Sequence, residues 1–170
     1  SSCSLGSKQP TPCATGTYSN ASGASACDGC DAGTYQDGEG RTACTPCEAG
    51  GYCVAGASSS KLCDAGSFGN RTGLASQAGC VLCPPGHHCS TGAEAPTPCS
   101  PGTVQPQAGQ GSCAECAAGS YQNAAGETAC FECAAGSYCE EGSSAERPCA
   151  AGSFGNASRL GGQHECHACP

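Results

Sequence analysis

The stretch CDAGTYQDGEGRTACTPC, Cys30–Cys47, returns 86 residues later as CAAGSYQNAAGETACFEC, Cys116–Cys133. All four cysteines, the glycine of the opening C-x-x-G and the tyrosine keep their places, whereas many other residues change. A chain that fixes its cysteines and lets the residues between them vary uses the cysteines as its structural frame.

The whole chain follows this frame. From Cys3, successive cysteine spacings are 10, 14, 3, 14, 3, 6, 10, 17, 3 and 6, and the series starts again at Cys89. The period is therefore 86 residues without an insertion. Nine complete modules each open with C-x-x-G, and all five tyrosines of the chain lie two residues after that glycine. Such periodicity predicts an array of small stacked units.

The cysteine series predicts the domain organisation. Residues 1–12 end a truncated short module, and residues 13–98 form a first 86-residue unit with modules 13–29, 30–46, 47–62, 63–82 and 83–98. Residues 99–168 form a second unit with modules 99–115, 116–132, 133–148 and 149–168, and residues 169–170 begin the next module. Because both ends fall inside a module, we expect the sequence to be a window on a longer array.

Composition restricts the class of protein. The chain has 20 cysteines in 170 residues, no Met or Trp, and only five Tyr and three Phe. A hydrophobic core of ordinary size is therefore absent, and cross-links must replace it, which requires an oxidising compartment. We expect an extracellular or cell-surface location, with the leader removed, because residues 1–30 contain no apolar signal-peptide core.

The charge balance excludes some partners. The formal net charge is −8, with only six Lys and Arg, so nucleic acid and direct membrane contact are not expected. No apolar run has the length of a membrane span.

The sequence of each module predicts little regular secondary structure. The C-x-x-G turn requires a glycine with positive φ, and the following TY, SY or SF favours a short extended stretch. We expect the ring to lie over a nearby disulfide and to supply most of the module's apolar contact. No stretch has helical periodicity. The predicted fold is an array of small disulfide-rich repeats, an elongated rod of short β-strands and loops with almost no helix.

Two disulfide registers fit pairing between sequence neighbours. The first gives Cys13–Cys27, Cys30–Cys44, Cys47–Cys53, Cys63–Cys80, Cys83–Cys89, Cys99–Cys113, Cys116–Cys130, Cys133–Cys139 and Cys149–Cys166. The second needs C-x-x-C bonds such as Cys27–Cys30, which are usually redox-active. The sequence favours the first register without fixing it. In that register Cys3 and Cys169 have no partner within the segment.

The pattern C-x-x-G-[ST]-[YF]-x(8)-C-x-x-C resembles the ephrin-receptor-like cysteine-rich repeat of large extracellular proteins, and residues 30–47 fit it from end to end. The first loop is also similar to the single-disulfide A1 module of tumour-necrosis-factor receptors. Short modules such as CEAGGYC depart from that module, which leaves the pairing of Cys47, Cys53, Cys83, Cys89, Cys133 and Cys139 open. The Ala-, Gly- and Ser-rich composition is similar to that of mastigoneme proteins, which form filaments on flagella.

Three sequons, Asn20-Ala21-Ser22, Asn70-Arg71-Thr72 and Asn156-Ala157-Ser158, predict N-glycosylation, and Asn70 and Asn156 occupy equivalent places in the two units. Thr-Pro pairs such as Thr45-Pro46 fit O-linked sugar or hydroxyproline, although the sequence favours ordinary turn prolines.

Other functional sites have weaker signals. The C-x-x-C pairs at Cys27/Cys30 and Cys44/Cys47 have nearly zinc-ribbon spacing, but the cysteine density favours disulfides. His164, Cys166, His167 and Cys169 form H-x-C-H-x-C, whose histidines are absent from the sister unit. Glu140-Glu141 is similarly unmatched, which argues against a calcium site. We predict no catalytic residue, metal or cofactor.

The sequence favours a structural segment of an extracellular filament or surface-glycoprotein coat, whose partners are copies of itself or other filament subunits and covalent glycans. The alternative is a receptor ectodomain, acting as a stalk or binding a protein ligand. A binding module should differ from its neighbours by exposed aromatic or Arg residues. Phe131 is the only Tyr or Phe outside the module motif.

Overall fold

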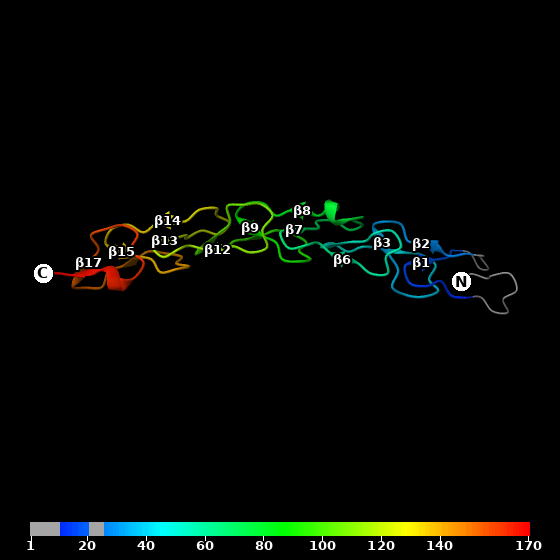
Figure 1. Cartoon of the computed structure of the whole chain (residues 1–170), viewed down its shortest axis with the longest axis horizontal. Helices are drawn as coiled ribbons and strands as arrows, with labels where there is room; N and C mark the ends of the chain where they lie inside the picture. The colour runs from blue at the N-terminus through cyan, green and yellow to red at the C-terminus, as the bar shows by residue number, and fades with distance from the viewer. Residues whose placement is uncertain (1–10, 21–25) are drawn as a thin grey trace. The chain divides into compact units, whose positions relative to one another are not determined.

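The computed structural model describes residues 11–20 and 26–170. Its regular structure consists of two-residue strands joined into nine two-stranded sheets (Figure 1). The paired strands are β1 (Thr17–Tyr18) with β2 (Asp28–Gly29), β3 (Thr34–Tyr35) with β4 (Thr45–Pro46), β5 (Gly51–Tyr52) with β6 (Lys61–Leu62), β7 (Ser67–Phe68) with β8 (Val81–Leu82), β9 (His87–His88) with β10 (Thr97–Pro98), β11 (Thr103–Val104) with β12 (Ala114–Glu115), β13 (Ser120–Tyr121) with β14 (Phe131–Glu132), β15 (Ser137–Tyr138) with β16 (Arg147–Pro148), and β17 (Ser153–Phe154) with β18 (His167–Ala168).

The described residues contain no α-helix, only the 3-10 turns η1 (Gln77–Gly79) and η2 (Gln163–Glu165). The prediction of small disulfide-rich repeats with short strands is therefore confirmed.

The opening turn of each module sets its hairpin. In the 30–46 module the Thr34 N–H and hydroxyl both donate to the Asp31 carbonyl, at 3.0 and 2.8 Å. The turn closes because Gly33 adopts φ 91°, in the left-handed region that L side chains rarely occupy. Tyr35 then pairs antiparallel with Thr45, and Thr34 pairs with Pro46. All nine C-x-x-G glycines have positive φ, as predicted.

Contacts divide the described chain into two compact units. One comprises the described residues up to Val81 together with Ser90–Ala95, and the other comprises Leu82–Cys89 together with Pro96–Pro170. The boundaries of these two units do not coincide with those of the 86-residue sequence repeat. The module limits given above therefore remain a prediction.

Cystine sulfur forms most of the core. The buried apolar residues of the described chain are Cys13, Cys30, Cys47, Cys53, Cys63, Leu74, Cys83, Cys89, Cys99, Val104, Cys116, Cys133, Cys139 and Leu160. The motif rings are partly buried, apart from Phe154, which is 42% exposed. Cystine sulfur and the partly buried rings therefore share the interior of a module, and the prediction that the ring supplies most of the apolar contact stays a prediction.

Candidate functional site: the junctions between modules

Nine disulfides hold the modules together internally. They join Cys13–Cys27, Cys30–Cys44, Cys47–Cys53, Cys63–Cys80, Cys83–Cys89, Cys99–Cys113, Cys116–Cys130, Cys133–Cys139 and Cys149–Cys166. The bonded Cα atoms lie 5.7 to 6.1 Å apart, within the usual range. These pairs are those of the first register, the short modules included. Among the described residues Cys169 is free and exposed, whereas Cys3 lies outside them.

Up to three backbone hydrogen bonds link each described module to the next. In the first, the C-x-x-G glycine donates to the residue that follows the ring of the next module. In the second, the residue that follows the ring of the same module donates to a loop carbonyl of the next module. In the third, a loop residue of the next module donates back to the first cysteine. The first bond is missing from the 63–82 and 133–148 modules, and the other two are present at every junction. Between the 30–46 and 47–62 modules the bonds are Gly33 N to Cys53 O (2.8 Å), Gln36 N to Ala57 O (3.1 Å) and Gly56 N to Cys30 O (2.7 Å).

The second unit repeats this junction with the same geometry. The equivalent bonds are Gly119 N to Cys139 O (2.8 Å), Gln122 N to Ser143 O (3.1 Å) and Gly142 N to Cys116 O (2.8 Å). Only main-chain atoms take part, so the junction is independent of which side chains the loops carry.

In six of the described modules the C-x-x-G glycine also lies against the module two places ahead; these glycines are Gly16, Gly33, Gly50, Gly86, Gly102 and Gly119. A Cβ at Gly33 would lie 2.5 Å from the Gly73 carbonyl oxygen, closer than any real Cβ contact. A Cβ at Gly119 would meet the Arg159 carbonyl in the same way. This glycine is therefore needed twice, for its φ and for the close approach of another backbone.

A second left-handed position recurs in the loops, and our sequence analysis missed it. It is occupied by Gly40, Gly56, Gly73, Gly92, Gly109, Gly126, Gly142 and Arg159. The signal is present in the sequence: this residue follows the module's first cysteine by nine residues in short modules and by ten in the others. Its N–H makes the bond back to the preceding module, as Gly73 does to Cys47 at 2.8 Å.

Arg159 is the one described non-glycine residue with positive φ, at 66°. Its N–H still donates to the Cys133 carbonyl at 2.8 Å. The guanidinium lies 3.5 Å from the Glu132 carboxylate, and both side chains are about two-thirds exposed, so this ion pair contributes little.

We predict that Arg159→Gly stabilises its junction slightly. The left-handed conformation costs a non-glycine residue about 1–2 kcal/mol. Loss of the exposed ion pair and the greater freedom of glycine when unfolded offset about 0.5 kcal/mol each, which leaves a net gain of about 0–1 kcal/mol. Amide exchange of residue 159 should therefore be unchanged or up to about fivefold slower. The matched change Gly73→Arg should speed exchange at residue 73, and faster exchange in Arg159→Gly would contradict the strain argument.

The residue after the ring faces the interior of its module, and its type differs between modules. It is Gln36, Gln105 or Gln122 in three 17-residue modules, Cys53, Cys89 or Cys139 in the short modules, and Gly69 or Gly155 in the long ones. In the long modules a leucine occupies the space, because a Cβ at Gly155 would lie 2.8 Å from Leu160 Cδ1. This position therefore distinguishes the module types, which our sequence analysis did not recognise.

The buried glutamines tie the loop ends together. Gln122 is fully buried, its Nε2 donates to the Ala129 carbonyl at 2.7 Å, and its Oε1 accepts from the Ala124 N–H at 3.0 Å. Gln36 makes the same two bonds, to Ala43 and from Gly38. No buried side-chain nitrogen or oxygen of the described residues lacks a partner.

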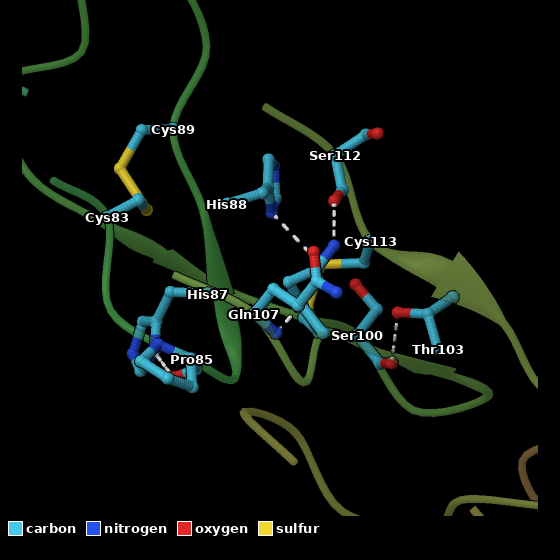
Figure 2. The surroundings of a disulfide bond; sticks show 12 residues. Cys83, Pro85, His87, His88, Cys89, Ser100, Thr103, Gln107, Ser112 and Cys113 are labelled. Carbon is cyan, nitrogen blue, oxygen red and sulfur yellow. Dashed lines mark hydrogen bonds between the residues drawn. A yellow bond between two sulfur atoms is a disulfide. The ribbon is translucent and has the colours of Figure 1, made fainter. Parts of the chain in front are cut away.

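His88 occupies the ring position of its module and faces the disulfide of the next one. Its Nδ1 lies 3.4 Å from Cys113 Sγ (Figure 2). His88, Cys99 and Cys113 are the only described group of three with metal-ligand atoms within 4.8 Å of one another. Both sulfurs are bonded in the Cys99–Cys113 disulfide, so they are not available as thiolate ligands.

The other candidate metal ligands have different roles in the structure. Cys27, Cys30, Cys44 and Cys47 are all in disulfides, so the zinc-ribbon spacing forms no thiolate set. In the H-x-C-H-x-C run Cys166 is bonded to Cys149, and the His167 ring lies 5.9 Å from that of Phe154. His164 lies beside Glu165 at 3.6 Å.

Glu140 and Glu141 line an exposed hollow of about 310 Å³ with Gly142–Ala145 and Arg147. The Glu140 carboxylate lies 3.5 Å from Arg147 Nη1. Arg147 therefore offsets part of the negative charge that would attract a cation.

The predicted sugar acceptors Asn70 and Asn156 are exposed, in the loops that follow β7 and β17. Asn20 is exposed as well, whereas Ala21 and Ser22 lie outside the described residues.

Comparison with known proteins identifies the repeat. Residues 16–63 and 102–147, just over half of the chain, match the family described as "Tyrosine-protein kinase ephrin type A/B receptor-like". A search of curated proteins finds no match. The helical elements of the described residues are three-residue turns, none long enough to cross a bilayer. Matched repeats and disulfides are those of an extracellular or cell-surface protein. The chain belongs to this ephrin-receptor-like family of cysteine-rich repeats.

Proposed function

We propose that the chain is a structural segment of an extracellular filament or surface-glycoprotein coat, in which the modules act as a disulfide-stapled rod. The observation that carries this proposal is the set of main-chain hydrogen bonds at the junction, which recurs to within 0.1 Å between the 30–46 module and its equivalent at 116–132. Its partners are copies of the chain or other filament subunits. A flagellar surface filament is one such assembly.

The junction explains why the loops are free to vary. Hydrogen bonds between main-chain groups, two left-handed positions and a disulfide set how one module meets the next. Exposed loop side chains make none of these main-chain bonds, so they can diverge without altering the stacking. Repeat proteins whose units contact mainly near neighbours form extended structures of this kind.

The receptor alternative has one specific observation in its favour. The Phe131 ring is 53% exposed and lies 5.9 Å from the Tyr121 ring, whereas the first unit has Thr45 at the equivalent place. An exposed aromatic residue that only one unit carries is typical of a binding hot spot.

Electron microscopy of native material in negative stain tests the proposal. We expect filaments or a continuous coat, with equivalent modules related by a constant axial repeat. Phe131→Ser should leave that assembly intact, because the ring is outside every junction bond. Discrete particles, together with a soluble protein that binds the chain and is lost in Phe131→Ser, would favour the receptor function instead.

A further inference from the structure

All three sequons of the chain begin at the same module position. Asn20 follows Tyr18, Asn70 follows Phe68 and Asn156 follows Phe154, each by two residues. Phe occupies the ring position only in the two long modules, and both of these have a sequon there. Because the remaining residues of the Asn20 sequon lie outside the described chain, the geometry below concerns Asn70 and Asn156.

The backbone directs the ring and the asparagine to the same side. Gly69 lies between Phe68 and Asn70, is buried, accepts from Gly50 N at 2.8 Å and donates to Ala93 O at 2.9 Å. Residues on either side of an inward-facing position in an extended segment share the outer face. Asn70 is accordingly exposed, and Phe68 keeps a smaller part of its surface exposed.

The second long module has the same arrangement, and its phenylalanine ring is more exposed to solvent. Phe154 is 42% exposed, Gly155 is partly buried, and Asn156 is exposed. Only the His167 ring lies near the Phe154 ring, at 5.9 Å, among the ring contacts of the described residues. The outer face of Phe154 is therefore free to receive an apolar surface.

We propose that Asn70 and Asn156 carry N-linked glycans whose first sugar packs the C–H face of its ring on Phe68 and Phe154. In the transfer, Asn Nδ2 forms a bond to C1 of the sugar while the C1–O bond to a lipid-pyrophosphate carrier breaks. The pyrophosphate leaves with the bonding electrons, and the amide nitrogen loses one proton. The inference rests on the extracellular location within the proposed function and is independent of the filament role.

The chain contains a near-match that serves as a control. Asn123 follows Tyr121 by two residues and is exposed, but Ala125 stands where a sequon needs Ser or Thr. We expect Asn123 to be unmodified in the natural chain and glycosylated in Ala125→Thr. The buried Gln122 keeps this loop in place, through its bond from the Ala124 N–H at 3.0 Å.

Glycopeptide mass spectrometry of the 170-residue chain, secreted from eukaryotic cells behind a leader peptide, tests the acceptor sites. We expect sugar at Asn70 and Asn156, loss of each in Asn70→Gln and Asn156→Gln, and a new site in Ala125→Thr. Bare asparagines at both positions in secreted, disulfide-bonded protein would overturn the inference. A filament seen by microscopy would still stand in that case, and glycans on material that forms no filament would leave the inference intact.

Nuclear magnetic resonance of the same glycoprotein tests the packing. Protons of the first sugar on Asn156 should show upfield ring-current shifts, which are lost in Phe154→Leu and kept in Phe154→Tyr. Leucine retains an apolar side chain at this half-exposed place, so the module should still fold. Unchanged sugar shifts in Phe154→Leu would show that the ring and the glycan are independent.

Discussion

Gly33→Ala is expected to destabilise its junction by about 2–5 kcal/mol. About 1–2 kcal/mol comes from placing a Cβ at φ 91°, and about 1–3 kcal/mol from forcing apart the two backbones. The new Cβ would lie 2.5 Å from the Gly73 oxygen and 3.1 Å from its carbonyl carbon, and neither atom belongs to a flexible side chain. The module at 63–82 must therefore move.

Gly136→Ala is the matched control, because Gly136 has φ 90° and no atom within 4 Å of the added Cβ. Gly136→Ala should lower the stability only by the cost of the left-handed conformation, about 1–2 kcal/mol. Hydrogen exchange separates the two effects, since the Gly33 and Gly73 amides donate to Cys53 and Cys47. Both should exchange faster in Gly33→Ala. If the two substitutions lowered stability equally, the contact between Gly33 and the module two places ahead would not contribute to stability.

The sequence predicted the features that are fixed within one module. The C-x-x-G turn is local, because Thr34 bonds back to Asp31 three residues away and Gly33 needs its φ whatever lies around it. The short strands follow directly from that turn. The disulfide pairing of the structure coincides with the sequence register, since sequence-adjacent cysteines such as Cys30 and Cys44 meet across a single hairpin.

Features that arise between modules were harder to predict. The left-handed loop position was missed because its residue, such as Gly73, is selected by a carbonyl in another module, Cys47 O. Arg159 further obscured the pattern, since the equivalent residue of the sister unit is glycine. Aligning the glycines by their distance from each first cysteine would have revealed the position.

The buried residue after the ring was overlooked for a similar reason. Within one module the tyrosine is the largest apolar side chain, so local reasoning makes it the core. In the structure the fully buried Gln122 follows the partly buried Tyr121 and also lies inside the module. A buried glutamine is stable only if both ends of its amide are bonded, and those partners lie across a loop whose shape the sequence does not show.

Gln122→Ala is expected to destabilise the 116–132 module by roughly 2–4 kcal/mol, through the void left in a packed centre and two lost hydrogen bonds. The Ala124 N–H and the Ala129 carbonyl lose their partner, although both residues are exposed enough for water to replace part of it. Exchange of the Ala124 amide should become fast, and that of Gly126, which donates to Cys99, should accelerate as the loop loosens.

Gln107→Ala provides the control, because Gln107 is an exposed glutamine in a comparable loop and only its backbone N–H bonds to Gln105. It should change stability by less than about 0.5 kcal/mol. Gln36→Ala, the equivalent substitution in the first unit, should reproduce the loss seen for Gln122, because the two side chains make the same bonds. A Gln122→Ala variant with unchanged stability would contradict this prediction. The disulfide alone would then hold the loop, and the hydrogen bonds of the Gln122 amide would not stabilise the module.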